Sequence, residues 1–134
     1  MKRILPQAFI GVTMAITFLA VSACKDIFHS KDSINYTELV LDMEHNDSVN
    51  KKNKDYYKFY AEQGKTYNIL IDKYEDYSIY IDAFWYDTEE TVIGELGFFR
   101  DGKTSFTATR SGNVVIRVTS QNINSSSYTI KITQ

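Results

Sequence analysis

The sequence has few residues that support covalent or metal chemistry. Its 134 residues include one cysteine, Cys24, one proline, Pro6, and two histidines, His29 and His45. One cysteine cannot form a disulfide within the chain, and neither histidine has a partner at the spacing of a zinc site. The sequence also lacks a phosphate-binding glycine loop, a nucleophile elbow and a metalloprotease helix, so a nucleophilic mechanism has no evident base. We therefore expect a protein that is not an enzyme.

The N-terminal 24 residues have the layout of a secretory signal. Lys2 and Arg3 precede an apolar run over residues 9–21. The run ends in Val21-Ser22-Ala23-Cys24, which resembles a bacterial lipobox because a branched apolar residue and two small residues stand directly before the cysteine. The resemblance implies that diacylglycerol is attached to the Cys24 thiol and that a signal peptidase then cuts between Ala23 and Cys24. The acyl chains would hold the mature protein at the membrane.

Two other interpretations of this segment stay open. The uncharged stretch from Ile4 to Cys24 has 21 residues, close to the roughly 20 that cross a bilayer as a helix, so an uncleaved anchor is one alternative. A lone cysteine can also be a buried thiol, since free cysteine packs as a small hydrophobe. Pro6 disfavours the anchor, and the position of Cys24 at the end of the apolar run favours lipidation.

Cleavage would leave one folded domain. Without residues 1–23 the chain has 111 residues, the size of a single small domain. We expect residues 24–33 to be the lipidated cysteine and a polar tether, and residues 34–134 to be the domain. Lys25, rather than an aspartate, follows the cysteine, which favours the outer membrane or the cell surface. The mature chain keeps 13 of the 15 basic residues against 17 acidic ones, a formal charge of −4, which disfavours nucleic acid as a partner.

Alternating apolar and polar residues predict an all-β domain. Strands are expected over 34–42, 55–61, 66–72, 78–87, 91–93, 96–99, 104–109, 114–119 and 128–133, and the polar stretch 44–54 is expected to be a loop. The segments 55–61 and 66–72 are separated by a short turn in which Gly64 is free to take a positive φ, so they are predicted to form a hairpin. Such a series of short strands indicates a sandwich or a barrel.

Four segments resemble, in order and spacing, the bacterial pre-peptidase C-terminal domain family. They are 55–69, 82–87, 107–118 and 127–132, and the resemblance covers roughly residues 45–134. It implies a jelly-roll-like antiparallel β-sandwich that is not itself catalytic. In the family this domain is appended to secreted proteases and other exported enzymes, and it is cut off or used for substrate and surface binding. This chain departs from that pattern because the domain stands alone behind a lipobox.

Four acidic residues near one predicted loop suggest a calcium site. They are Asp42, Glu44, Asp47 and Asp55, and carboxylate oxygens are the ligands that calcium prefers. The resemblance adds to this, because relatives that bind collagen hold calcium near the start of the sandwich. The spacing matches no known calcium loop, however, and acidic loops are more often simply solvated. We therefore expect no cofactor and keep calcium as the alternative.

Aromatic residues supply the other candidate site. The candidates are Tyr74, Tyr77, Tyr80, Phe84 and Tyr86, with Tyr56 and Tyr60, because tyrosine combines apolar area with a polar group and recurs at binding surfaces. The alternative is that a small sandwich needs aromatic residues in its core, which we expect for Tyr57 and Trp85. The sequence thus predicts a surface-anchored, non-catalytic lipoprotein that binds a protein or a glycan. The alternative is an accessory or structural subunit of an exported protease or an envelope complex.

Overall fold

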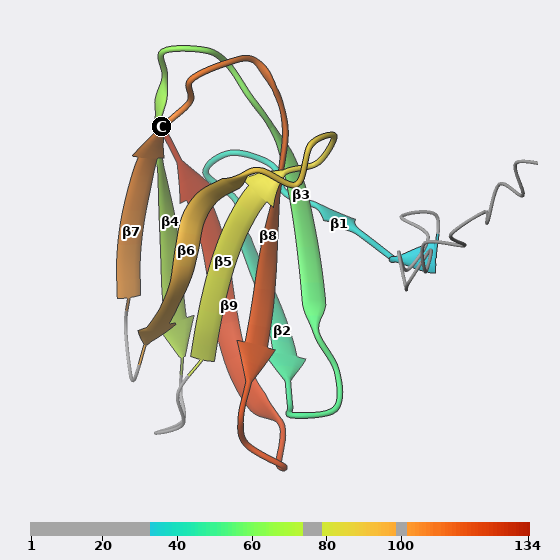
Figure 1. Ribbon diagram of the computed structural model, residues 1–134. Coiled ribbons are helices and arrows are strands. Elements are labelled where there is room, and N and C mark those ends of the chain that lie inside the picture. Colours follow the sequence, from blue (N-terminus) through green and yellow to red (C-terminus); the bar gives the residue numbers. More distant parts are fainter. Residues whose placement is uncertain (1–32, 74–78, 99–101) are drawn as a thin grey trace, which may run out of the picture.

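The computed structural model describes residues 33–73, 79–98 and 102–134, which form a β-sandwich (Figure 1). The strands are β1 (Thr37–Glu38), β2 (Glu44–Val49), β3 (Asp55–Ala61), β4 (Thr66–Lys73), β5 (Ile79–Trp85), β6 (Thr91–Phe98), β7 (Gly102–Thr107), β8 (Gly112–Ser120) and β9 (Ser126–Thr133). The expected all-β sandwich is therefore confirmed. The predicted signal peptide, Ala23, Cys24, the tether up to residue 32, Tyr74 and Tyr77 lie outside the described residues.

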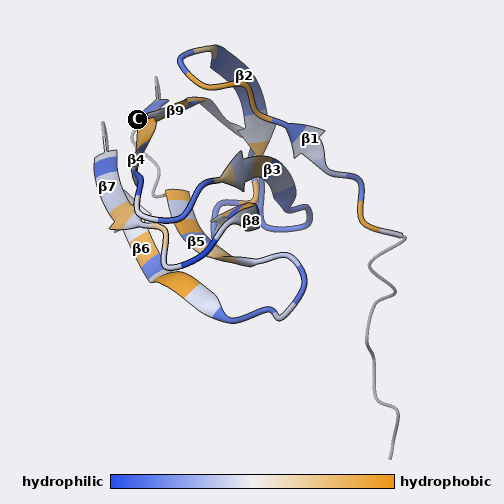
Figure 2. Cartoon of the chain, turned by 90° about the horizontal axis from the view of Figure 1, so that it is seen from above, coloured by the Kyte–Doolittle hydropathy of each residue, from blue (hydrophilic) through white to orange (hydrophobic). Residues whose placement is uncertain are grey.

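The strands form two sheets that pack face to face. Sheet A has the order β1-β3-β8-β5-β6, and sheet B has the order β2-β9-β4-β7. In Figure 1, β5, β6 and β8 of sheet A lie in front of β9 and β2 of sheet B. Every pairing is antiparallel except that of β1 with β3, which is parallel and only two residues long. Seen along the strands, β1 lies at the side of the sandwich beside β2 and β3 (Figure 2).

Alternation of inward and outward residues in the central strands builds the core. In β5, Ile79, Ile81, Ala83 and Trp85 are buried and the residues between them are half-buried, as the sequence predicts. β3, β4, β8 and β9 also turn every second residue inward, so each supplies isoleucine, valine or an aromatic ring to one contiguous core, although the outward Val115 of β8 and Thr129 of β9 are buried as well. Burying one such side chain stabilises a fold by about 1.5–3 kcal/mol. Tyr57 and Trp85 are both in this core, at 0% and 3% exposure, as expected.

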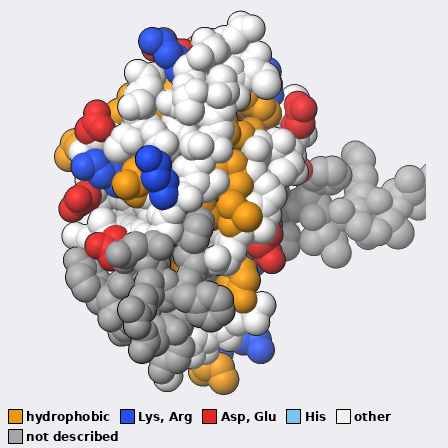
Figure 3. All heavy atoms as spheres, turned by 90° about the vertical axis from the view of Figure 1, so that its left-hand side faces the viewer, with side chains coloured by type: hydrophobic (Ala, Val, Ile, Leu, Met, Phe, Trp, Pro, Cys, Tyr) orange, Lys and Arg blue, Asp and Glu red, His pale blue; other side chains and the backbone are white. Residues whose placement is uncertain are grey.

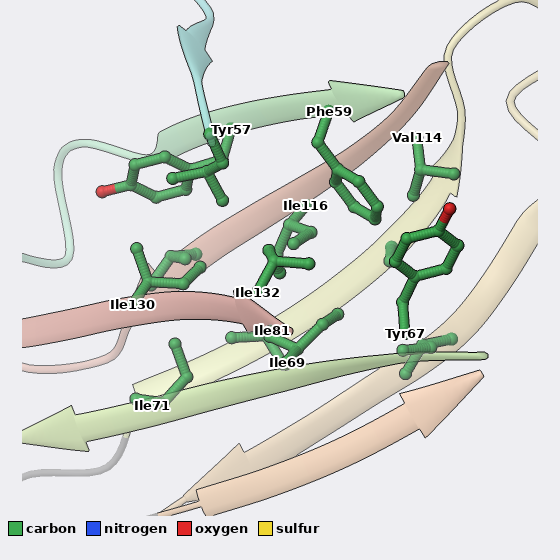
Figure 4. Close-up of a cluster of buried hydrophobic side chains, with 14 of the residues drawn as sticks. Tyr57, Phe59, Tyr67, Ile69, Ile71, Ile81, Val114, Ile116, Ile130 and Ile132 are labelled. Atoms are coloured by element: carbon green, nitrogen blue, oxygen red, sulfur yellow. The ribbon is translucent and has the colours of Figure 1, made fainter. Parts of the chain in front are cut away.

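The predicted hairpin of β3 and β4 is wrong. β3 pairs with β1 and β8 in sheet A, whereas β4 pairs with β7 and β9 in sheet B. The inward rows of the two strands face each other across the core (Figure 4), and the rings of Phe59 and Tyr67 lie 5.3 Å apart. Gly64, at φ 80°, turns the chain from one sheet to the other, and its N–H donates to the carbonyl of Ala108. Burial of two apolar rows against each other thus outweighs side-by-side pairing.

The N-terminal strands also differ from the prediction. Only Thr37–Glu38 of the expected strand 34–42 is extended in a sheet, and the expected loop 44–54 contains β2. β2 is polar because it is the edge of sheet B and buries only Val49 fully, so its sequence has no apolar alternation. His45, which falls in the expected loop, is half-buried on this strand. The two short strands expected over 91–93 and 96–99 form one strand, β6, whose pairing with β5 is irregular near Ala83.

The side of the sandwich that carries β6 and β7 shows a narrow band of hydrophobic side chains among polar surface (Figure 3). Leu96 of β6 is 40% exposed. The residues that the structure describes include no helix long and apolar enough to cross a membrane.

Candidate functional site

Aromatic and charged side chains gather on the outer face of sheet A. The ladder pairs Tyr56 of β3 with Arg117 of β8 and Arg117 with Asp82 of β5, so these side chains form one row across three strands. The next row holds Lys58, Val115 and Phe84 in the same way. We call this surface the aromatic face and define it by Tyr36, Tyr56, Lys58, Tyr80, Phe84, Tyr86 and the Asp82–Arg117 pair.

Tyr36 joins the rings of the aromatic face. It precedes β1 at the edge of sheet A, and its ring meets those of Tyr56 and Tyr86 edge to face, at centroid distances of 6.1 and 5.5 Å. Burial, together with the neighbouring Tyr86 and Tyr56, raises the pKa of the Tyr36 hydroxyl. Edge-to-face contacts of this kind add about 0.5–1.5 kcal/mol to the burial of the rings.

Lys58 lies between these rings. Its Nζ is 5.5 Å from the centroid of Tyr36 and 5.3 Å from that of Tyr86, which is within the range of a cation–π contact. The same Nζ is 2.9 Å from Oε1 of Glu38, and this hydrogen bond raises the pKa of Lys58. The cation is therefore held in place by one carboxylate and two aromatic rings.

Val115 shows that this face is packed. It points outward from β8, opposite Lys58 and Phe84, yet it is completely buried and does not belong to the core between the sheets. Side chains on the outer face must therefore cover it. A packed layer of this kind fixes the rings in place and lowers the entropy that a ligand would have to remove on binding.

The Asp82–Arg117 pair fixes two charges beside the rings. Nε of Arg117 donates to Oδ1 of Asp82 over 2.9 Å, and Nη2 donates to Oδ2 over 2.6 Å. The side chains are 33% and 19% exposed, and the hydrogen bonds to Asp82 raise the pKa of Arg117. A bidentate pair of this geometry presents donors and acceptors in one fixed orientation.

Tyr80 lies against a glycine. Gly97 is its partner in β6, and a β-carbon built on Gly97 would lie 2.9 Å from Cε1 of the Tyr80 ring. Only glycine leaves room for the ring in this position.

Of the predicted aromatic candidates, Tyr80, Phe84 and Tyr86 are half-buried on this face, while Tyr60 is 59% exposed at the end of β3. The sequence reasoning missed Tyr36, Lys58 and Arg117. The outward parity of Lys58 and Arg117 in their strands could have found those two, but nothing in the spacing indicates the parallel pairing that brings Tyr36 to the face.

Two of the four predicted calcium ligands, Asp47 and Asp55, accept hydrogen bonds from tyrosine hydroxyls. The Tyr57 hydroxyl donates to Oδ2 of Asp47 over 3.0 Å, and the Tyr128 hydroxyl donates to Oδ2 of Asp55 over 2.7 Å. The two hydroxyl oxygens are 2.5 Å apart. Burial raises the pKa of both tyrosines and of Asp55. Within the described ranges no three His, Cys, Asp or Glu side chains are grouped to hold a metal ion.

The side chains of Asp47, Tyr57, Tyr128 and Asp55 form a tyrosine–carboxylate chain of hydrogen-bond contacts. This chain lacks one proton when both carboxylates are ionised. Three oxygen–oxygen contacts link the four groups, and each tyrosine supplies one proton to its own carboxylate. The contact between the two hydroxyls then contains no proton. A proton on Asp55 would fill the chain, which agrees with the raised pKa of that carboxyl.

The outer face of sheet B is different in chemistry. Its outward side chains are small, polar or charged, apart from Leu70: Glu44, Asn46, Ser48, Thr66, Asn68, Leu70, Asp72, Lys103, Ser105, Thr107, Ser127, Thr129, Lys131 and Thr133. A hollow of about 200 Å³ lies there, lined by Glu44, Leu70, Asp72, Thr129 and Lys131. Small-molecule sites usually measure about 300–1,000 Å³. Among the described surfaces, the aromatic face is thus the stronger candidate.

None of the protein-family models and none of the curated proteins matches the sequence. Several solved structures resemble the fold, including the following three. The pre-peptidase C-terminal domain of a collagenase from Bacillus anthracis has a TM-score of 0.62 at 13% identity, covering 73% of this chain and 94% of that one. CorA, a surface-associated copper-binding protein important in copper acquisition by Methylomicrobium album BG8, has a TM-score of 0.58 at 8% identity, covering 74% and 97%. PliG, a periplasmic inhibitor of g-type lysozyme from Aeromonas hydrophila, has a TM-score of 0.54 at 15% identity, covering 73% and 97%. At these identities the likeness shows the fold alone, and it is the sandwich that the sequence resemblance implies.

Proposed function

We propose that this chain is a non-catalytic binding module of the bacterial cell envelope, anchored by lipid at Cys24, and that it binds a protein or a glycan through the aromatic face. The observation that carries the proposal is the difference between the two outer faces. Rings, a held cation and a fixed ion pair share the outside of sheet A, whereas the outward side chains of sheet B include no aromatic residue in the described ranges.

The chemistry of the face suits both ligand classes. Aromatic rings stack on the apolar sides of sugar rings and also anchor protein interfaces. Arg117, Asp82 and Lys58 add hydrogen-bond donors and acceptors in fixed positions. Tyr74 and Tyr77, proposed from the sequence, belong to the same binding hypothesis.

The comparisons support a place in the envelope. One structural neighbour is surface-associated and another is periplasmic, and the second acts on a protein, g-type lysozyme. The lipid anchor and the outer membrane are proposed from Val21-Ser22-Ala23-Cys24 and Lys25 in the sequence. Calcium binding near Asp42, Glu44, Asp47 and Asp55 is a secondary proposal that rests on the family resemblance.

A second candidate is an accessory subunit of an exported protease. The observation that favours it is the likeness to the solved pre-peptidase C-terminal domain of a collagenase. In this case the aromatic face would bind the protease itself.

Capture experiments with residues 25–134 test these proposals. This segment contains every described strand and the whole core. Tyr80→Ala with Phe84→Ala removes two rings from the aromatic face, and Leu70→Ala on the outer face of sheet B is the matched control. We expect the double variant to lose at least about tenfold in affinity for the captured protein or glycan, equivalent to the 1.4 kcal/mol or more lost when interface hot-spot residues are truncated.

The identity of the captured molecule separates the two candidates. An exported protease from the same cell supports the accessory role, and a surface glycan or another envelope protein supports the first proposal. Equal binding by the double variant and the parent contradicts the aromatic face as the site in both cases.

A further inference from the structure

The N-terminal segment of the domain occupies a site on the rest of the molecule. We call residues 34–39 the arm. Its Tyr36 ring packs against Tyr56 and Tyr86, and its Glu38 pairs with Lys58. Leu39 is 8% exposed and belongs to the core cluster, and its N–H donates to the carbonyl of Lys58. The arm thus inserts a ring, a carboxylate and an aliphatic side chain into matching positions.

Few backbone bonds hold the arm in this site. β1 has two residues in its ladder with β3, while the other strands have six to nine residues each. The ion pair with Lys58 is open to solvent, since the Glu38 side chain is 65% exposed. Elements with short ladders and exposed hydrogen bonds open before the rest of a fold. The arm can therefore leave its site while the other eight described strands stay paired.

We call residues 40–43, which connect the arm to the body, the joint. In this single copy the joint has a strained backbone and exposed apolar side chains. Asp42 adopts φ 64°, a left-handed conformation that costs free energy in a residue other than glycine. Val40, Leu41 and Met43 beside it are 59%, 37% and 60% exposed. If the joint were extended, Asp42 would leave this conformation and the arm would point away from its own body.

We propose that the arm of one copy of this chain occupies the arm site of a second copy. The structure shows that the arm fits this site in its own chain, and a second copy carries the same Tyr36, Glu38 and Leu39 in the same order. All arm contacts are retained when the arm comes from another copy, which makes exchange of an identical element a low-cost route to a dimer. The two joints meet where the chains cross, and their aliphatic side chains then cover one another.

Paired single-cysteine variants test the exchange. Residues 25–134 contain no native cysteine. Glu38 and Lys58 are direct partners in the parallel ladder, so their Cα atoms are within the range that a disulfide bridges. Glu38→Cys protein is mixed with Lys58→Cys protein, oxidised mildly and resolved on a non-reducing gel. The control mixes Glu38→Cys with Ser105→Cys, an exposed position on the outer face of sheet B.

Exchange predicts a disulfide-linked heterodimer in the first mixture at roughly tenfold or more the control yield, because docking raises the effective concentration of the two thiols. Equal yields in the two mixtures would overturn the proposal. Since each substitution removes the Glu38–Lys58 pair, unsubstituted protein is also studied by light scattering over a range of concentrations. A mass that stays at one copy at every concentration also overturns it, whether or not the aromatic face binds a ligand.

Discussion

Removal of one buried hydroxyl group gives a sharp test of the tyrosine–carboxylate chain. In Tyr128→Phe, Asp55 loses the hydroxyl that donates to it over 2.7 Å, while the Tyr57 hydroxyl keeps Asp47. Asp55 is half-buried, so water replaces the lost donor incompletely. Loss of a hydrogen bond to a partly buried charged group costs about 1–3 kcal/mol. For a domain of about 100 residues this lowers the Tm by roughly 5–15 °C.

Tyr57→Phe is the matched comparison, because it removes the hydroxyl next along the same chain. Its carboxylate partner, Asp47, has a side chain that is 39% exposed and can be hydrated after the loss. We therefore expect Tyr57→Phe to cost about 1 kcal/mol or less, clearly below the cost of Tyr128→Phe. Urea unfolding monitored by circular dichroism and by tyrosine fluorescence measures both free energies.

The pH dependence of the free energy of unfolding tests the hydrogen bond from Tyr128 to Asp55 independently. Burial raises the pKa of Asp55 in the folded state, and the hydrogen bond from Tyr128 lowers it in part. The folded protein therefore holds the Asp55 proton more tightly than the unfolded chain, so stability falls as the pH rises from the ordinary aspartate pKa of 3.8 through the raised pKa of the folded state. Without the Tyr128 hydroxyl this pKa rises further, so the cost of Tyr128→Phe should be larger near about pH 7 than near about pH 4. Equal costs at the two pH values, or a larger loss in Tyr57→Phe, would refute this reasoning.

Three further predictions concern other parts of the chain. Cys24→Ala should abolish labelling by palmitate and leave unprocessed precursor, and normal maturation of that variant would contradict the lipobox interpretation. Gly97→Ala should displace the Tyr80 ring, seen as changed ring proton shifts in NMR spectra, at a stability cost below about 1 kcal/mol; Gly94→Ala is the control, since nothing lies within 4 Å of its added β-carbon. Arg117→Gln should cost about 1–2 kcal/mol in urea unfolding, because both hydrogen bonds to its aspartate partner are lost at a half-exposed site; an unchanged midpoint would show that the ion pair contributes nothing.

Local pattern was sufficient to predict the strands that have one face in the core. β5 alternates without exception between Ile79 and Trp85, because every second residue is buried between the sheets. β2 gives no such signal, since its place at an edge requires only Val49 to be apolar and its ladder with β9 supplies the rest. Backbone pairing at an edge is available to almost any sequence, which is why a polar strand there cannot be distinguished from a loop.

Which strands pair with each other was harder to predict from the sequence than where the strands lie. A turn of the same length can join two strands of one sheet or carry the chain between two sheets, and here the facing rows around Phe59 and Tyr67 decide for the second. The candidate site follows the same rule. Tyr80, Phe84 and Tyr86 share a face because of their spacing in the sequence, but Tyr36 and Tyr86 are 50 residues apart, and their contact depends on the parallel pairing of β1 with β3.

The way in which the chain enters the fold also has a mechanical consequence. A pull on the residues N-terminal to β1 reaches the sandwich first through the arm, whose two-residue ladder with β3 is the shortest in the described fold. The arm would detach before the force reaches the other strands of the two sheets. Its six residues would then release roughly 20 Å of additional chain, at up to about 3.3–3.6 Å per extended residue. A domain tethered at its N-terminus would thus lengthen its reach under tension while the core stays folded.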